Sequence, residues 1–387
     1  MRVLMQNRTD AFRNYGGDTT QMLKTKECLE NLGVDVDINL DLRPDLTNYN
    51  IVHLFNVTRI HETYMQCKNA LEQHKPVVLS TIHHSKIDIE NYEKKALKGV
   101  SQTLKKVFSN ENHFQLVKTL FYVLQSRKGF PAILKQLQIG FKQQQEFVLN
   151  NSSVWLPNSQ MELDTILKEF CVSQKSSVIV PNGVEIDDNI INTDSSIFES
   201  KYKIKDFILC AGRIEPRKNQ VSVMMALENS NIPVIFAGGL NNKHKWYITK
   251  FNDYLKKNKN FIYIGNIDRT LLYSGFKACK VSVLPSWFET TGLVGLEAGL
   301  MGTNVVITNK GYTQEYFEDK AWYCDPENIE SIRDAILSAY NSNRSKYDLK
   351  SKIVDQYTWE KAAEETLKAY NLCESHLYCT GANSNLL

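Results

Sequence analysis

The chain has 387 residues, of which 42% are hydrophobic, 23% charged and 10% aromatic. This composition is ordinary for a folded globular protein and excludes a disordered chain, a collagen-like chain and a small disulfide-stapled domain. The formal net charge of +3 is too close to zero to indicate nucleic acid binding by itself. At roughly 150 residues per domain, the length predicts two or three domains.

Short apolar runs alternate with amphipathic stretches, a rhythm typical of parallel sheets with helical crossovers. In the first part, strands are predicted at residues 1–6, 34–38, 51–55, 76–82, 153–156 and 177–180, and helices at about 18–31, 59–73 and 160–170. The rhythm breaks at about 86–150, where Lys, Gln, Leu and Phe accumulate, and we expect a helical insertion there. The turn Pro181-Asn182-Gly183 is the candidate linker to a second part.

A second alternating set follows this linker. Its predicted strands lie at residues 207–211, 234–237, 261–264, 281–284 and 304–308, and its predicted helices at about 219–229, 243–256, 269–277, 292–301, 329–340 and 359–372. We therefore predict an α/β protein with two doubly wound domains, 1–180 and 181–358. The helix within 359–387 is expected to pack back on the first domain before a loose tail. A ligand is expected between the domains, beyond the carboxyl ends of the strands.

The segment Gly16-Gly17-Asp18 follows the first predicted strand and opens the first helix, with Asp18 as the expected cap. Glycines let the backbone approach a ligand closely, and a helix N-terminus offers N–H groups to an anion. The segment has neither the Gly-x-Gly-x-x-Gly pattern nor a Walker lysine. A plain strand–helix turn explains it equally well.

Two cations follow the first strand of the second domain. Arg213 and Lys218 lie five residues apart, across a turn that contains Pro216. A guanidinium fork and an ammonium point charge suit a diphosphate. Cations at the start of a helix oppose its dipole, so helix stabilisation is a poor explanation for them. A basic surface turn is the alternative interpretation.

Residues 285–298 carry two acidic side chains at a suggestive spacing. Glu289 lies in the loop after a predicted strand, and Glu297 lies eight residues later in a helix that Thr290 or Thr291 can cap. A carboxylate accepts hydrogen bonds from two neighbouring sugar or ribose hydroxyls, and N–H groups at the helix start suit a phosphate. Two solvated glutamates that flank a helix are the alternative.

Together these motifs resemble those of the retaining glycosyltransferases of family four. That family has the GT-B fold, in which two Rossmann-like domains face each other across a nucleotide-sugar cleft. The match covers most of the chain and comprises Gly16-Gly17, the His83 segment, Pro181-Asn182-Gly183-Val184, Gly212-Arg213, Lys218, Gly238-Gly239, Gly265 and residues 289–302. The motifs are similar to those of bacterial enzymes that build surface polysaccharides such as O-antigen or capsule.

The resemblance implies a role for each motif. Arg213 and Lys218 would hold the donor diphosphate, Glu297 the ribose hydroxyls, and Glu289 the hydroxyls of the transferred sugar. The other implied donor-binding residues are Gly16, Gly17, Gly212, Gly265, Asn266, Ile267, Thr291, Gly292 and Leu293.

The acceptor side departs from the family pattern. His83 matches the family histidine near the reacting sugar carbon and joins Arg213, Lys218 and Glu289 as an implied catalytic residue. Most relatives have an aspartate after that histidine, where this chain has His84, so the choice between the two histidines stays open. Glu185 stands where an aspartate usually follows Asn-Gly-Val.

The chemistry follows from charge. Negative charge grows on the diphosphate as the sugar–phosphate bond breaks, and fixed cations and N–H groups stabilise that charge. The cation pair takes the role that a divalent metal has in other enzymes, and none of the donor-site motifs contains an Asp-x-Asp metal pair. We therefore expect no metal and no other cofactor. The resemblance implies retention at the anomeric carbon.

The predicted insertion is strongly basic. Residues 91–148 contain ten Lys or Arg and three Glu, interleaved with aromatic residues. Such helices suit an anionic membrane surface, with each cation contributing about 1 kcal/mol. A solvated basic face over an ordinary core stripe is the alternative. A lipid-linked acceptor would favour the membrane interpretation.

Cellular location follows from what the sequence lacks. No apolar run approaches the roughly 18 residues of a membrane span, and the first seven residues are too polar for a secretory signal. The eight cysteines are scattered, which predicts free thiols in a reducing compartment. We expect a cytoplasmic protein, peripheral on the inner face of the membrane if the basic segment binds lipid.

The leading hypothesis is a retaining glycosyltransferase that moves a sugar from a nucleotide sugar to a glycan or lipid-linked acceptor. Two alternatives share the expected fold: a non-catalytic nucleotide-sugar-binding or scaffold protein, and a GT-B enzyme of another class such as a sugar-nucleotide epimerase. A phosphorylase would need a pyridoxal lysine site and a longer chain. Nucleic acid is not an expected partner.

Overall fold

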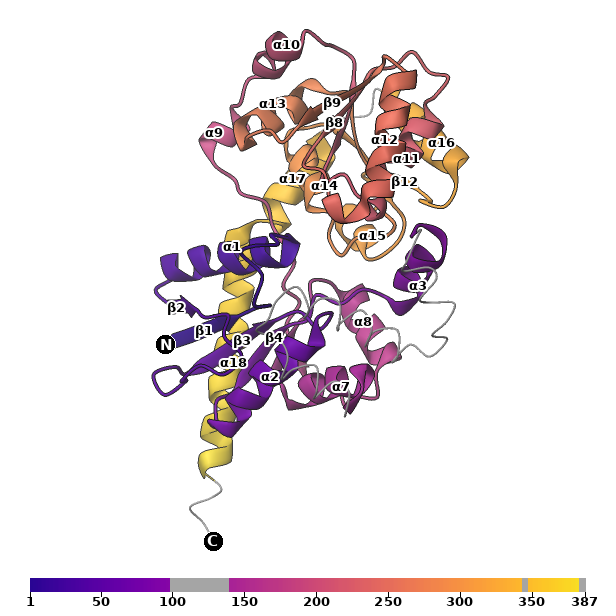
Figure 1. Ribbon diagram of the computed structural model, residues 1–387. Helices are drawn as coiled ribbons and strands as arrows, with labels where there is room; N and C mark the ends of the chain where they lie inside the picture. Colours follow the sequence, from indigo (N-terminus) through magenta and orange to yellow (C-terminus); the bar gives the residue numbers. More distant parts are fainter. Residues whose placement is uncertain (98–138, 343–346, 383–387) are drawn as a thin grey trace. The chain divides into compact units, whose positions relative to one another are not determined.

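The computed structural model describes residues 1–97, 139–342 and 347–382, and it separates into two compact units (Figure 1). The first unit comprises residues 1–83, 99–182 and 359–387, and the second comprises 84–98 and 183–358. Each unit is built on a six-stranded sheet in which all the pairs are parallel. No helix in the described ranges has the length and apolar character needed to cross a bilayer.

The first unit has the strand order β2-β1-β3-β4-β5-β6. The strands are β1 (Arg2–Gln6), β2 (Asp35–Ile38), β3 (Ile51–Phe55), β4 (Val77–Ser80), β5 (Val154–Leu156) and β6 (Ser176–Ser177). Around them lie the helices α1 (Gly17–Asn31), α2 (Ile60–Glu72), α7 (Phe141–Asn151), α8 (Gln160–Glu169) and α18 (Trp359–Ala382). Helix α18 packs against α1, and α2 packs against α7.

A buried polar contact ties the C-terminal helix to the first sheet. His53, in the middle of β3, bonds the Tyr370 hydroxyl of α18 through Nδ1 (2.7 Å) and the Ser80 hydroxyl of β4 through Nε2 (2.9 Å). Burial lowers the pKa of His53 to about 3, so the ring is neutral. The last segment of the chain is therefore a core element of the first unit.

The second unit has the strand order β12-β11-β10-β7-β8-β9. Its strands are β7 (Ile208–Ala211), β8 (Val234–Ala237), β9 (Phe261–Gly265), β10 (Val281–Leu284), β11 (Asn304–Thr308) and β12 (Trp322–Cys324). The helices are α3 (Lys86–Lys95), α9 (Asp188–Ile191), α10 (Ser196–Tyr202), α11 (Gln220–Ala226), α12 (Lys245–Lys257), α13 (Arg269–Ala278), α14 (Leu293–Leu300), α15 (Thr313–Phe317), α16 (Ile329–Tyr340) and α17 (Tyr347–Gln356), with the 3₁₀ turns η2 (Pro216–Lys218) and η3 (Asn242–His244).

Both faces of the second sheet are covered, which explains why its strands are continuous apolar runs. In β7, Ile208 and Cys210 belong to a core cluster shared with α11, α12 and α16. Leu209 and Ala211 belong to a separate cluster shared with α13, α14 and α17. Figure 1 shows α11, α12 and α16 beside one another on one side of this sheet.

Helix α3 differs from its predicted place. The sequence assigns residues 84–98 to the first domain, as the start of the helical insertion, whereas the structure groups them with the second unit. The reason is a set of contacts to the loops after β10 and after β11. The ring of Tyr92 lies 5.8 Å from that of Phe288, and the Asp88 carboxylate accepts a 3.2 Å hydrogen bond from the N–H of Gly311. Most of the predicted insertion, 98–138, lies outside the described residues.

Two strand-end loops of the second sheet approach each other closely. Gly238 follows β8 with a φ of +140°, and a Cβ on it would lie 2.1 Å from the carbonyl oxygen of Gly212, which follows β7. Only glycine fits there. The loops at the carboxyl ends of β7 and β8 are therefore packed directly against each other, backbone to backbone.

Gly238→Ala should destabilise the protein by about 2–4 kcal/mol, because the backbone of Gly212 must move to relieve the overlap. Gly265→Ala is the matched control. That residue also has a positive φ (+72°), but nothing lies within 4 Å of the position of a Cβ, so only a backbone penalty of about 1–2 kcal/mol is expected. Urea unfolding of both variants measures the difference, and equal losses would contradict the close-approach argument.

Candidate functional site

Glu289 lies in the loop after β10, and backbone hydrogen bonds tie this loop to two neighbouring turns. The N–H of Trp287 donates to the carbonyl oxygen of Arg217 in η2 (2.9 Å). The carbonyl oxygen of Glu289 accepts from the N–H of Tyr312 (3.0 Å), and its N–H donates to the carbonyl of Lys310 (3.4 Å). The carboxylate of Glu289 is thus placed by the turn after β7 and the turn after β11 together.

Glu289 is nearly buried, with 8% exposure, and lies among cations. Its Oε1 is 2.5 Å from Nζ of Lys218, and its Oε2 is 3.7 Å from Nη1 of Arg217. Burial by itself would raise the pKa of Glu289, but Lys218 and Arg217 outweigh burial and hold that pKa at about 2. Burial lowers the pKa of Lys218, and Glu289 opposes that change.

A second carboxylate, Glu215, lies on the other side of the same turn. Its Oε2 is 3.0 Å from Nε of Arg213 and accepts a 2.8 Å hydrogen bond from the amide of Asn241. Its Oε1 is 3.7 Å from Nε of Arg217. Arg213 and Lys218 therefore bond different carboxylates, and Arg217 contacts both. The Arg213 side chain keeps 48% exposure, whereas Lys218 keeps 15%.

Sequence reasoning missed Glu215 and Arg217, although both stand inside the motif that it singled out. The available signal was the sequence of charges Arg213, Glu215, Arg217, Lys218, in which one carboxylate lies among three cations. Counting the two carboxylates that the cations contact, the cluster holds three positive and two negative charges and has a net charge of +1.

Glu297 lies in α14, at the end of a second polar chain. Its Oε1 accepts a 3.4 Å hydrogen bond from the Tyr273 hydroxyl. The guanidinium of Arg269 lies over the Tyr273 ring, 5.4 Å from its centroid, and pairs with Glu185. Burial raises the pKa of Glu297 to about 7, with Arg269 and Tyr273 opposing the rise. Glu289 and Glu297 thus have opposite environments: one is ionised and ion-paired, and the other titrates near neutrality.

Helix α14 begins without a side-chain cap, so the prediction that Thr290 or Thr291 caps it was wrong. Gly292 takes the cap position with a φ of +78°. A Cβ there would lie 2.6 Å from Ile307, so the close packing on β11 also favours glycine. The Thr291 hydroxyl instead bonds that of Tyr316 (3.3 Å). Leu293 is the first residue of the helix.

The remaining predicted donor residues of the second unit lie at the ends of β7 and β9. The N–H of Gly212 donates to the carbonyl of Ala237, and that of Gly238 donates to the carbonyl of Gly265 (both 2.8 Å). A Cβ on Gly239 would lie 3.1 Å from the amide oxygen of Asn266. Ile267 packs on the core under α13 and α14. The loops of β7, β8 and β9 are therefore adjacent at the carboxyl edge.

In the first unit, His83 is buried, with 2% exposure. Its backbone N–H donates to Glu162 (2.8 Å), and its Nε2 lies 2.8 Å from a carboxylate oxygen of Glu169. The next residue, His84, belongs to the second unit, and its ring lies 4.9 Å from that of Phe288, beside Glu289. The two histidines of the sequence thus have separate surroundings.

Gly16 and Gly17 lie at the N-terminus of α1, but Asp18 does not cap the helix as predicted. Gly16 holds the cap position with no side-chain hydrogen bond. The Asp18 carboxylate is bonded by the buried guanidinium of Arg8 (2.6 Å), which also donates to Asp10 (2.8 Å). The charges next to this helix start are therefore already paired.

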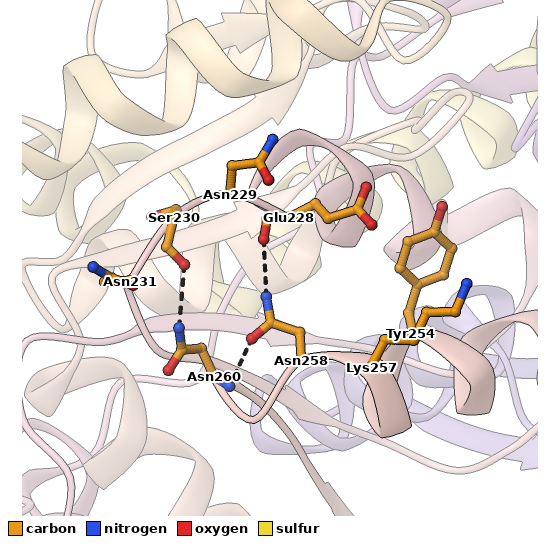
Figure 2. Close-up of a pocket in the computed structure, with 8 residues that line it drawn as sticks. All are labelled: Glu228, Asn229, Ser230, Asn231, Tyr254, Lys257, Asn258 and Asn260. Carbon is orange, nitrogen blue, oxygen red and sulfur yellow. Dashed lines mark hydrogen bonds between the residues drawn. The ribbon is translucent and has the colours of Figure 1, made fainter.

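A shallow polar depression of about 330 Å³ lies elsewhere on the second unit (Figure 2). Its walls are the turns before β8 and β9, so it is at the amino edge of the sheet, opposite the loop of Glu289. Asparagine amides tie the two turns together: Asn258 donates to the carbonyl of Glu228 (3.1 Å) and Asn260 to that of Ser230 (3.2 Å). The asparagine residues of this depression therefore have a structural role, which is to join the two turns.

In the part of the chain that the structure describes, no group of three or more His, Cys, Asp or Glu is placed to hold a metal. The acidic pair Asp35 and Asp37 on β2 is an Asp-x-Asp sequence, but both residues bond Arg2 (3.3 and 2.8 Å). The described cysteines are free.

Comparisons with known proteins identify the fold. The structure superposes on sucrose-phosphate synthase of Thermosynechococcus elongatus with a TM-score of 0.70 and 13% identity, covering 97% of this chain and 100% of the other. It superposes on HepE of Anabaena, solved with UDP-glucose, with a TM-score of 0.68 and 13% identity, covering 96% and 99%. The fold is GT-B.

Sequence comparison adds a family match. Residues 193–372 match the family described as Glycosyl transferases group 1. An uncharacterized glycosyltransferase of Methanocaldococcus jannaschii is 27% identical over 214 residues (50% of this chain, 53% of the relative). The O-antigen chain mannosyltransferase B of Escherichia coli is 25% identical over 185 residues (44% and 48%). The chain spans about half the length of these curated relatives. The group 1 segment contains Arg213, Lys218, Glu289 and Glu297.

Glu297→Gln should raise the melting temperature at pH 8 and have a smaller effect at pH 5. The pKa of this carboxyl rises from an ordinary 4.5 to about 7 in the folded chain, so the wild-type protein loses stability as pH rises through that window. The neutral glutamine has no such dependence. Thermal unfolding at pH 5, 6, 7 and 8 measures the difference, with Glu364→Gln on an exposed position of α18 as the control. A gap that does not grow with pH would contradict the environment described for Glu297.

Proposed function

We propose that the protein is a retaining glycosyltransferase that uses a nucleotide-sugar donor and acts in surface polysaccharide synthesis. The observation that carries this proposal is the net positive cluster of Arg213, Arg217 and Lys218 with Glu289, at the carboxyl edge of the second sheet. A diphosphate suits such a cluster, because cations that are already held in position stabilise an anion without having to be reorganised.

In this proposal, Lys218 exchanges one anion for another. In the structure it bonds Glu289. A donor diphosphate would take the Lys218 ammonium and the exposed Arg213 guanidinium, and Glu289 would accept hydrogen bonds from hydroxyls of the transferred sugar. As the bond to the anomeric carbon breaks, the two cations stabilise the growing charge on the leaving phosphate. That oxygen accepts the proton of the acceptor hydroxyl while the acceptor oxygen bonds the anomeric carbon on the same face, which retains the configuration.

The other predicted residues complete the donor site. Glu297 would accept from the ribose hydroxyls. The backbone of Thr291, Gly292 and Leu293 would line the phosphate, with Gly212 beneath it and Gly265, Asn266 and Ile267 facing the base. Gly16 and Gly17 of the first unit would approach the donor, and either His83 of the first unit or His84 of the second would approach the reacting carbon. We propose no metal, because the cations supply the positive charge.

The relatives support the substrate classes. The similarity to the O-antigen chain mannosyltransferase favours a glycan or lipid-linked acceptor in surface polysaccharide synthesis. HepE was solved with UDP and UDP-glucose, which favours a nucleotide sugar. We further propose that the protein is cytoplasmic and that its basic segment 91–148 binds anionic membrane. Cosedimentation with vesicles that contain anionic lipid tests this proposal, and binding independent of anionic lipid would contradict it.

A donor screen tests the enzyme class. Hydrolysis and thermal shift with a panel of UDP-, GDP-, ADP- and dTDP-sugars should identify one donor that the protein binds more tightly than the corresponding nucleoside diphosphate and hydrolyses slowly without acceptor. Binding of nucleotides alone, without preference for any nucleotide sugar and without turnover, would favour a non-catalytic protein.

Arg213→Ala should lower turnover by about 10²-fold, the cost of removing one preorganised stabilising group. Its melting temperature should stay within about 2 °C of wild type, because a half-exposed ion pair contributes at most about 1 kcal/mol. Arg333→Ala, at an exposed position of α16, is the control and should leave both quantities unchanged. Full turnover by Arg213→Ala would contradict its role on the diphosphate.

A further inference from the structure

Arg217 contacts the loop of Glu289 through both its backbone and its guanidinium. Its carbonyl oxygen accepts the N–H of Trp287 (2.9 Å). Its guanidinium donates to the carbonyl oxygen of Phe288 (3.4 Å) and lies 5.7 Å from the centroid of that ring. The same guanidinium is 3.7 Å from Glu215 through Nε and 3.7 Å from Glu289 through Nη1. No other described cation is in contact with both carboxylates of the cluster.

The position of Arg217 beside Glu289 matters once a donor is bound, so this inference rests on the proposed function. Lys218 is the closest cation to Glu289 in the structure, yet it is also the cation proposed for the diphosphate. A nearly buried carboxylate that loses its partner takes up a proton or moves. Among the described residues, Arg217 is the remaining cation within 4 Å of Glu289.

We propose that Arg217 is a positioning residue that keeps Glu289 ionised and oriented toward the transferred sugar while Lys218 exchanges that carboxylate for the donor diphosphate. It acts through Glu289 and does not itself contact the donor. Its contacts with Phe288 and Glu215 hold it in place, so its charge stays beside Glu289 when Lys218 leaves.

The geometry also explains why an arginine is needed. A guanidinium is planar and presents donors in several directions, so one group reaches Glu215 through Nε while Nη1 faces Glu289 and the Phe288 carbonyl. A lysine ammonium at the same position would supply the charge but reach fewer of these acceptors. Arg217→Lys should therefore restore the charge and only part of the orientation.

Binding measurements separate positioning from direct contact. Calorimetry with the full chain would compare UDP with UDP-glucose and GDP with GDP-mannose, for wild type, Arg217→Gln and the exposed control Arg333→Gln. We expect Arg217→Gln to bind the nucleoside diphosphate within about twofold of wild type but to lose most of the extra affinity for the nucleotide sugar. Equal losses for both ligands would instead make Arg217 a phosphate ligand and overturn the proposal.

The pH dependence of turnover gives a second readout. We expect the ratio of Arg217→Gln to wild-type kcat, at saturating donor, to fall as pH drops from 8 to 5, because Glu289 with fewer cations protonates more readily. Other charged or titratable groups belong to this cluster or to segments in contact with it: Arg213, Glu215, Lys310, His84, Asp88 and Tyr92. The titration of the groups that do not contact Arg217, Glu297 among them, is common to both proteins and cancels in the ratio. Glu215 loses its contact with Arg217 in the variant but keeps Arg213 at 3.0 Å.

Arg217→Lys keeps the test valid if Arg217→Gln folds poorly. It should remove the pH dependence of the ratio while leaving kcat below wild type. A ratio that is flat with pH in Arg217→Gln, or a kcat equal to wild type, would overturn the proposal. If the wild-type chain binds no nucleotide sugar better than its nucleoside diphosphate, the proposed function itself fails, which is a distinct result.

Discussion

The contact between the Lys218 ammonium and the Glu289 carboxylate is the interaction on which the carboxyl edge of the second sheet depends. Either charge alone in so covered a place would cost several kcal/mol, whereas the pair with Arg217 beside it is tolerated. The two groups come from different loops, after β7 and after β10, so each loop stabilises the other. The backbone bond from Trp287 to Arg217 joins them a second time.

In this arrangement each cation of the cluster is paired with a carboxylate of the same chain. The cations have internal carboxylate partners, and the net charge of the cluster is +1 when both carboxylates are ionised. Under the proposed function, an incoming anion would replace a partner that the cations already have, and little of the surrounding structure would have to change. Glu297 differs because burial brings its pKa to about 7, so this second glutamate responds to pH where Glu289 does not.

The sequence predicted the two sheets well, because strands covered on both faces are short continuous apolar runs. The strand-end motifs that it singled out in the second half, from Gly212 to Gly292, lie on adjacent loops of one sheet edge, and Glu297 lies in the helix that follows them. Helix caps were harder to predict. Asp18 and Thr291 are good caps by residue type, but the Asp18 carboxylate pairs with Arg8 and the Thr291 hydroxyl bonds that of Tyr316. Neither partner belongs to the helix that the residue was expected to cap.

Long-range pairing also explains the other differences. Nothing in the local sequence of residues 84–98 indicates that Tyr92 contacts Phe288, in the loop after β10, or that Asp88 contacts Gly311, in the loop after β11. Both partners are more than 190 positions away. Glu215 and Arg217 resemble ordinary turn residues until β10 brings Glu289 beside them. Sequence patterns report periodicity and local chemistry, whereas the partner of a buried charge is decided by the topology.

The assignment of His83 and His84 to different units has a covalent consequence. The chain contains no cis peptide bond in its described part, so the α-carbons of these neighbours stay about 3.8 Å apart. One imidazole is anchored by Glu169 and the other rests on the aromatic ring next to Glu289. These two neighbours in the chain therefore have separate partners: a carboxylate of α8 for the first ring and the Phe288 side chain for the second.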